Sequence, residues 1–138
     1  MQMKPDLIYS VLCDDVRQEI NGKFMFIGVF QNLWAKNFPA VHYRICIANS
    51  WYNGVGEFNA RSAIIAPDKK TRIIESVPVK IKLNEENRGS IVVNFFQNVR
   101  LAEPGVYWVE VSLDDMLVAR YPFRVAKAKP VKQTRPAA

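Results

Sequence analysis

The side chains that could support catalysis are few and separated along the chain. Nucleophilic and general-base mechanisms need a histidine or paired carboxylates in a cleft. His42 is the only histidine, and in an alternating segment it would share a face with Arg44, which favours a surface or structural role. Cys13, beside Asp14, would be an activated thiol only if a cation lowered its pKa, and a buried cysteine at the end of a strand is the favoured interpretation. We expect no catalytic activity, and an enzyme is the third of three functional hypotheses.

Metal and cofactor sites are also not expected. Cys13 and Cys46 are the only cysteines, and without a CxxC or His-rich spacing they predict two free thiols packed as small apolar groups. A disulfide between neighbouring strands is the alternative. Calcium needs six to eight clustered oxygen ligands, and no D-x-D spacing is present. Three acidic pairs near loops are therefore interpreted as solvated turns: Asp14-Asp15, Glu85-Glu86 and Asp114-Asp115.

Composition and charge are typical of one globular domain. Of the 138 residues, 49% are apolar and 23% are charged, as in folded domains and unlike disordered chains. No apolar run approaches the ~20 residues of a membrane-spanning helix. The N-terminus lacks the pattern of a signal peptide, so we expect a cytoplasmic protein.

The positive charge is concentrated near the C-terminus. The net charge is +6, and residues 127–138 hold four of the 19 cations and no acid. We predict one domain over residues 1–126 and a disordered basic tail over residues 127–138. The domain shows no basic stripe with interleaved aromatic residues, so nucleic-acid binding is not expected.

Short alternating segments and turn signals follow one another along the chain. No segment of ten or more residues shows the 3.6-residue period of a helix. Strands are predicted at residues 7–13, 41–50, 57–66, 73–83 and 90–96, with loops at 32–39 and 51–56. The pattern predicts an all-β, antiparallel immunoglobulin-like or C2-like β-sandwich of about 7–9 strands. A closed barrel is the alternative. Pro78 and Pro122 indicate edge strands, where proline hinders pairing between subunits.

Two hairpins frame the predicted domain. In the first, Asn21-Gly22 predicts a two-residue type I′ turn, which pairs Val16 with Ile27 and Arg17 with Phe26. The face expected to be buried then consists of Val16, Ile20, Met25, Ile27 and Val29. In the second, residues 106–125, a three-residue loop matches the apolar positions best. That loop, residues 114–116, gives the pairs Leu113–Leu117, Val111–Ala119 and Tyr107–Phe123 and leaves Trp108, Glu110, Arg120 and Arg124 outside.

Exposed aromatic and cationic side chains are the candidates for binding. Trp34, Trp51 and Tyr52 lie in predicted loops, where such residues anchor protein partners, stack on sugar rings or cover the ends of a sandwich. Trp108 and Arg120 on the outer face of the second hairpin, and Arg17 on the first, complete the candidate interaction surface.

Two binding hypotheses follow from this surface. The first is a non-catalytic interaction or structural module, with a protein partner or with a second copy through an edge strand. The second is a module for a small ligand or a carbohydrate that uses Trp34, Trp51 and Tyr52.

Two motifs resemble a known family. CDDVRQEINGKFMFIGVF begins at Cys13, and PGVYWVEVSLDDMLVARYPFRV begins at Pro104. Together they resemble a bacterial family known only as a domain of unknown function, over most of residues 6–125. The resemblance implies a sandwich fold and no established activity, ligand or partner. The segment PGVY is also similar to immunoglobulin-like domains in which a tyrosine hydrogen-bonds back to the preceding corner, although the Cys…Trp…Cys spacing of antibody domains is absent.

Overall fold

The computed structural model describes residues 2–129, which form ten β-strands and no helix. The strands are β1 (Asp6–Gln18), β2 (Phe24–Val29), β3 (Asn32–Ala35), β4 (Ala40–Tyr52), β5 (Gly56–Ile65), β6 (Arg72–Glu75), β7 (Val79–Leu83), β8 (Ser90–Leu101), β9 (Gly105–Leu113) and β10 (Met116–Lys127). Over this described range no helix is present that would be long and apolar enough to cross a membrane.

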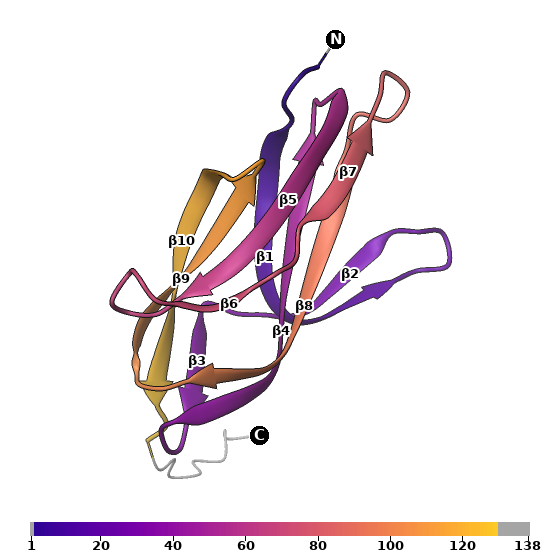
Figure 1. Cartoon of the computed structure of the whole chain (residues 1–138). Coiled ribbons are helices and arrows are strands. Elements are labelled where there is room, and N and C mark those ends of the chain that lie inside the picture. The colour runs from indigo at the N-terminus through magenta and orange to yellow at the C-terminus, as the bar shows by residue number, and fades with distance from the viewer. Residues whose placement is uncertain (1, 130–138) are drawn as a thin grey trace.

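The strands form two sheets (Figure 1). One sheet has the order β2-β1-β4-β8, and the other has the order β3-β10-β9-β5-β6, with β7 also paired to β5. The pair β3–β10 is parallel and the other pairs are antiparallel. The orders β1-β4-β8 and β5-β9-β10 correspond to strands A-B-E and C-F-G of an immunoglobulin domain. The predicted all-β immunoglobulin-like sandwich is confirmed, with ten strands.

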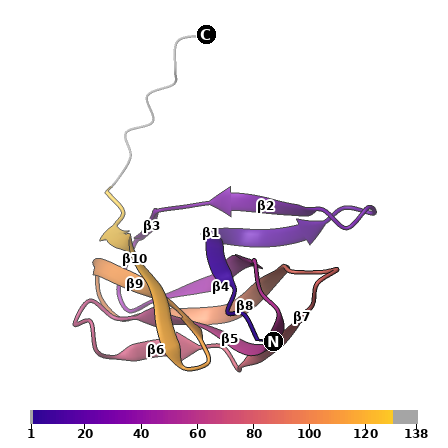
Figure 2. The ribbon, with the colours of Figure 1, turned by 90° about the horizontal axis from the view of Figure 1, so that it is seen from above.

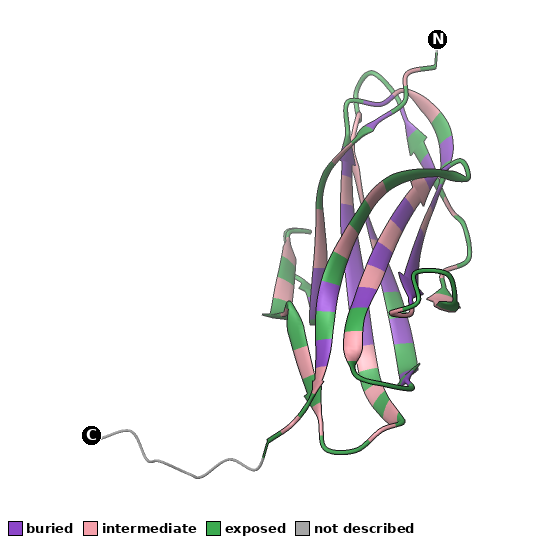
Figure 3. Cartoon of the chain, turned by 90° about the vertical axis from the view of Figure 1, so that its left-hand side faces the viewer, coloured by how far each residue is buried: buried purple, intermediate pink, exposed green. Residues whose placement is uncertain are grey.

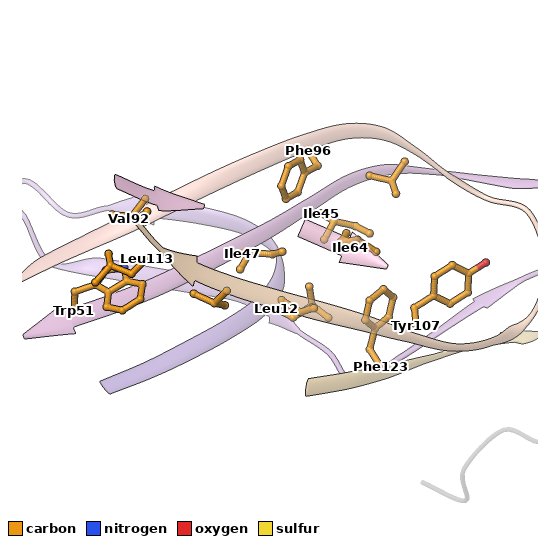
Figure 4. Close-up of a cluster of buried hydrophobic side chains, with 14 of the residues drawn as sticks. Leu12, Ile45, Ile47, Trp51, Ile64, Val92, Phe96, Tyr107, Leu113 and Phe123 are labelled. Carbon is orange, nitrogen blue, oxygen red and sulfur yellow. The ribbon is translucent and has the colours of Figure 1, made fainter. Parts of the chain in front are cut away.

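The hydrophobic core lies between the two sheets. Along the strands, buried side chains alternate with exposed ones (Figure 3), as the two-residue period of a strand requires. The largest fully buried side chains include Trp51, Tyr107, Phe123, Ile45, Ile47, Ile64 and Leu113 (Figure 4). Leu101 is also fully buried. Burial of each large apolar side chain contributes about 1.5–3 kcal/mol, so these contacts hold the sheets together.

Tyr107 fixes the corner that precedes β9. Its hydroxyl donates a hydrogen bond to the carbonyl oxygen of Glu103 at 2.6 Å, and its ring stacks on Phe123 with the centroids 5.7 Å apart. Burial raises the pKa of Tyr107. This geometry confirms the hydrogen bond to the corner that the PGVY segment implied.

The turn between β9 and β10 is shorter than predicted. Leu113 lies opposite Met116, which leaves only Asp114 and Asp115 between the strands. Both residues have positive φ, 48° and 63°, as a type I′ turn requires. The prediction of a three-residue loop was therefore wrong.

A β-bulge nevertheless restores the predicted faces of this hairpin. The register shifts between Leu117 and Ala119, and beyond that point Val111 faces Ala119 and Tyr107 faces Phe123, as expected. A short turn followed by a bulge produces the same downstream register as a longer loop, so the apolar pattern did not distinguish them.

The first hairpin differs from its prediction in both turn and register. The N–H of Glu19 donates to the carbonyl oxygen of Lys23 at 2.8 Å, so the loop contains residues 20–22. Of the two predicted turn residues, only Gly22 has positive φ, at 90°. A three-residue loop whose last residue is a glycine with positive φ replaces the predicted type I′ turn.

The longer loop inverts the faces of β2. Val16 is opposite Phe26 instead of Ile27, and Arg17 is opposite Met25. The side chains that were expected to be buried with Val16 are instead exposed: Ile20, Met25, Ile27 and Val29. The prediction failed because both faces of β2 carry apolar residues, so a shift of one residue exchanges one apolar set for another.

Beyond Cys13, β1 leaves the body and pairs with β2. This hairpin arm, residues 14–29, projects from the sandwich (Figure 2). Its inner face covers a second, small cluster in which Cys13 lies directly opposite Cys46, with Phe24 and Phe26 packed nearby. Both cysteines are buried free thiols, and burial raises the pKa of Cys13 to about 11. The thiols thus pack as apolar groups.

Three other elements depart from the predicted boundaries. The expected loop at residues 32–39 contains β3, because these residues pair with β10. The expected strand at residues 73–83 is divided at Pro78 into β6 and β7, which both lie on the same side of β5 at the sheet edge. The predicted tail begins inside the sandwich, since β10 continues to Lys127; residues 130–138 lie outside the described part.

Candidate functional site

Trp51 is a core residue and not a surface anchor. The expected loop at residues 51–56 begins as strand, because β4 continues through Trp51, which pairs with Leu7 and Ser90. The indole is fully buried. The placement of Trp51 on a binding surface was wrong because the strand continues two residues beyond Ser50 and alternation turns this side chain inward.

Trp34 and Tyr52 are exposed but far apart. Their exposed fractions are 66% and 52%. Trp34 lies beside Ala40 and Val41 at the start of β4, whereas Tyr52 ends that strand. A strand of this length spans roughly 40 Å at about 3.3 Å per residue. With Trp51 buried, the three aromatic residues do not form the shared platform that the carbohydrate hypothesis requires.

Trp108 and Arg120 do lie together on the outer face of the six-stranded sheet. The Arg120 guanidinium lies 6.0 Å from the Trp108 ring centroid, and the Lys69 ammonium lies 5.2 Å from it. Arg120 also donates two hydrogen bonds to Glu110, at 2.8 and 3.1 Å. The two cations over the Trp108 ring and the hydrogen bonds from Arg120 to Glu110 give Trp108 and Arg120 a structural role.

Arg17 lies on the hairpin arm, away from the other candidates. Its Nε donates to Asp15 Oδ2 at 2.9 Å, and the Arg44 guanidinium reaches the same carboxylate at 2.9 Å. The hydrogen bond from Arg17 is the main cause that lowers the pKa of Asp15. Arg17 and Asp15 lie on one face of β1 and form an ion pair.

A lateral cleft opens at the side of the sandwich, where β1 of one sheet passes β10 of the other. It has a volume of about 610 Å³. Its lining comes from β1, β9, β10 and the chain from the end of β2 to the start of β3: Ser10, Val11, Leu12, Val29, Phe30, Gln31, Asn32, Val106, Tyr121, Pro122, Phe123 and Arg124. Most of these side chains are apolar, so the cleft can shield an apolar group of a ligand from water.

Two unpaired strand edges border this cleft. In the described chain, β2 pairs with β1 only from Cys13 onward, so residues 6–11 have a strand partner only in β4. Likewise, β3 pairs with β10 only from Arg124 to Lys127. The Arg124 N–H points toward the β3 side, so the alternating backbone places Pro122, which has no N–H, on that same side. The β10 edge therefore lacks a donor.

A chain of polar side chains joins the sheets at the cleft. Ser10 Oγ donates to Asn49 Oδ1 at 2.6 Å, and Asn49 Nδ2 donates to Ser62 Oγ at 2.7 Å. Because the single Ser10 proton is used, the Tyr121 hydroxyl donates to Ser10 Oγ at 2.8 Å. Burial raises the pKa of Tyr121 to about 12, which keeps it a neutral donor.

The hydrogen bonds at the cleft do not activate Ser10 as a nucleophile. Ser10 donates to an amide oxygen, which cannot take its proton as a general base would. His42 lies 3.7 Å from Asp14 at the base of the arm. Among residues 2–129 no group of three or more His, Cys, Asp or Glu side chains could hold a metal ion.

Sequence reasoning missed the cleft because the cleft depends on which strands remain unpaired. The first hairpin pairs β1 only in its second half, and β3 crosses to the opposite sheet. Neither pairing leaves a motif in the sequence. Pro122 was the one available signal, since proline in a strand marks an edge.

The fold and the corner tyrosine define an immunoglobulin-like β-sandwich. Residues 8–126 match the family model described as "Family of unknown function (DUF6941)". The chain belongs to this family, which confirms the resemblance drawn from its two motifs. No curated protein matches the sequence at a significant level.

Solved structures share the general fold. The alkylpurine DNA glycosylase AlkC of Pseudomonas fluorescens, bound to DNA with an abasic-site analogue, superposes with a TM-score of 0.52 at 10% identity. The match covers 89% of this chain and 30% of the glycosylase. An immunoglobulin-like protein of Pseudomonas aeruginosa gives a TM-score of 0.44 at 15% identity, covering 90% and 98% of the two chains. At such identities the likeness to the glycosylase concerns the fold alone.

Proposed function

We propose that this protein is a non-catalytic interaction module that binds an extended segment of a partner protein in the lateral cleft. The segment adds a strand beside residues 6–11 of β1. The observation that carries the proposal is the unpaired edge of β1 next to an apolar cleft of about 610 Å³. Backbone groups along such an edge are a template for strand addition.

The two borders of the cleft have different roles in this proposal. Pro122 removes one N–H from the β10 edge, so a bound strand pairs with β1 and only packs against β10. Side chains of the strand that face inward enter the space beside Leu12, Tyr121 and Phe123. Since every second residue of a strand points to one face, the preferred segment has alternating apolar residues.

Charge and packing restrict the segment further. Among the described residues that line the cleft, Arg124 is the only charged one, so a carboxylate at the matching end of the segment would be favoured. Backbone hydrogen bonds to β1 supply affinity, and the apolar residues that alternate along the segment fit the cleft and supply specificity.

Selection from a displayed library of random peptides tests this proposal. Peptides selected by the full chain should alternate in polarity. Val29→Asp should weaken their binding at least about tenfold, because it places a charge at the mouth of the apolar cleft. Val77→Asp is the matched control. Val77 is exposed like Val29, at 78% against 63%, but it lies between β6 and β7 and does not line the cleft. The control should bind as the parent does.

Amide exchange locates the bound strand. Binding of a selected peptide should slow hydrogen exchange within residues 6–11 of β1. Peptides that bind Val29→Asp as tightly as the parent, or that leave the exchange of β1 unchanged, would contradict the proposal.

A further inference from the structure

A second groove lies near the end of the sandwich where β3 and the last residues of β10 run side by side. This Trp34 groove has a volume of about 880 Å³ and is lined by Trp34, Pro104, Gly105, Arg124, Val125, Ala126, Lys127, Ala128 and Lys129. It shares only Arg124 with the lateral cleft. A ligand in the groove would therefore leave the mouth of the cleft at Val29 open.

The floor of the groove is made of small residues beside one large aromatic side chain. The parallel pairing of β3 with β10 places Trp34 next to Ala126, and Gly105 lies opposite Val125 on the neighbouring strand β9. Trp34 is 66% exposed. Its ring therefore contributes little to the core and forms the wall of an open, shallow surface on which a flat ring can stack.

The rim of the groove is positively charged. Arg124, Lys127 and Lys129 are exposed, and in the described structure none of them forms an ion pair, whereas Lys80 and Lys82 both pair with Glu57. No carboxylate is present in the lining over the described residues. The sequence after Lys129 adds two cations, Lys132 and Arg135, and no acid.

We infer that the Trp34 groove binds single-stranded nucleic acid. A positive groove that follows the phosphate backbone, combined with an aromatic platform for a base, is the arrangement that binds single strands without reading their sequence. One base stacks on Trp34 above Ala126, and the neighbouring phosphates pair with Lys127 and Lys129. Nucleic-acid binding was not expected because these cations were assigned to a detached tail, whereas β10 continues to Lys127, which lines the same groove as the exposed Trp34.

The chemistry separates this ligand from other polyanions. An acidic peptide would satisfy the cations but would leave Trp34 unused. A base has a flat π-face, and stacking on an aromatic side chain strengthens binding of each stacked base by roughly tenfold or more. The site should therefore bind an oligonucleotide with bases more tightly than an abasic oligomer of equal charge.

Fluorescence anisotropy with the full chain tests the inference. The probes are a labelled oligothymidylate of about 12 nucleotides, an abasic oligomer of the same length, and poly-glutamate of equal charge. The oligothymidylate should bind at least about fivefold more tightly than the other two. Trp34→Ala should abolish this preference, whereas Trp34→Phe, which keeps a ring, should retain most of it.

Charge variants test the phosphate contacts separately. The double variant Lys127→Ala/Lys129→Ala should reduce the slope of log affinity against log salt by about 1.4, since each phosphate contact on a single strand contributes about 0.7. Lys80→Ala/Lys82→Ala is the matched control, because it removes the same charge from β7 and should change the slope by much less. Tyr52→Ala is the aromatic control for Trp34.

Three results would overturn the inference. The first is equal affinity for the oligothymidylate and the abasic oligomer, and the second is equal affinity for the oligothymidylate and poly-glutamate. The third is a preference for the oligothymidylate that stays unchanged in Trp34→Ala. A loss of affinity in Lys80→Ala/Lys82→Ala equal to that in Lys127→Ala/Lys129→Ala would also count against it, because it would show attraction to net charge alone.

Discussion

The two long hairpins of this sandwich differ in what lies beneath them. The β9–β10 hairpin is part of the six-stranded sheet, and one of its faces is buried against the opposite sheet. The hairpin arm projects from the four-stranded sheet, and its inner face covers only the small cluster around Cys13 and Cys46. The β9–β10 hairpin is stabilised by its turn, by the neighbouring strands of its sheet and by the core. The arm is stabilised mainly by its turn and by the pairing of β2 with the end of β1.

This difference predicts unequal local stability within one domain. Phe123 on β10 is 2% exposed, whereas Met25 and Ile27 on β2 are exposed at 43% and 47%. Segments with few buried apolar contacts open more readily than core strands. The arm should therefore exchange its amide hydrogens faster than β9 or β10.

The largest expected contrast is between two phenylalanines. Phe123→Ala should lower the free energy of unfolding by about 3–5 kcal/mol, as for other buried aromatic residues. Phe26→Ala should cost less, about 1–2 kcal/mol, because Phe26 is only half-buried in the arm. Urea denaturation of both variants measures the difference. Equal losses would show that the arm belongs to the same cooperative core.

The next contrast is between two glycines of the arm. Gly28 has φ of 68°, and a Cβ there would clash with the Asp14 carboxylate, while Gly22 has φ of 90° and open space around it. Gly28→Ala should cost about 2–3 kcal/mol and Gly22→Ala about 1–2 kcal/mol, the cost of a left-handed conformation alone. The same urea titration applies. If Gly28→Ala/Asp14→Ala is no more stable than Gly28→Ala, the clash is not the cause.

Unfolding at high pH tests how the β9–β10 hairpin is packed at the lateral cleft. Burial raises the pKa of Tyr121 from 10.0 to about 12, so folding favours its neutral form. That stability is present below pH 10 and is lost as the pH rises toward 12, by about 2 kcal/mol. Unfolding measured from pH 9 to pH 12 should show this loss, and Tyr121→Phe should show less of it. An identical pH profile in the variant would exclude Tyr121 as a source.

The same contrast explains what the sequence could predict. Where one face is buried, as in β9 and β10, alternation identified the buried side chains and the pairs Val111–Ala119 and Tyr107–Phe123 even though the turn was wrong. In the arm both faces of β2 are apolar, so nothing opposed a shift of one residue. The corner formed by Tyr107 was also predictable, because it depends on a local segment.

The candidate sites were less predictable, because they depend on strand pairing over long distances. The cleft exists because β2 leaves the first half of β1 unpaired. The Trp34 groove exists because β3 joins β10 in parallel, which places Trp34, expected in a loop, opposite Ala126. The error at Trp51 has a local cause, because β4 ends at Tyr52 and not at Ser50 as predicted.

The smallest expected effects come from two arginines, one on each hairpin. Arg17→Ala should change the free energy of unfolding by less than about 0.5 kcal/mol, because the Arg17 side chain is 67% exposed and Asp15 keeps its bond to Arg44. Arg120→Ala should cost more, about 1 kcal/mol, since the Glu110 side chain is only 12% exposed and loses two hydrogen bonds. Differential unfolding by urea resolves this order when both variants are compared with the parent. If Arg17→Ala lowers the free energy of unfolding more than Arg120→Ala does, ion pairs stabilise the arm more than the exposure of Arg17 suggests. The contrast between the two hairpins would then have to be based on apolar burial alone.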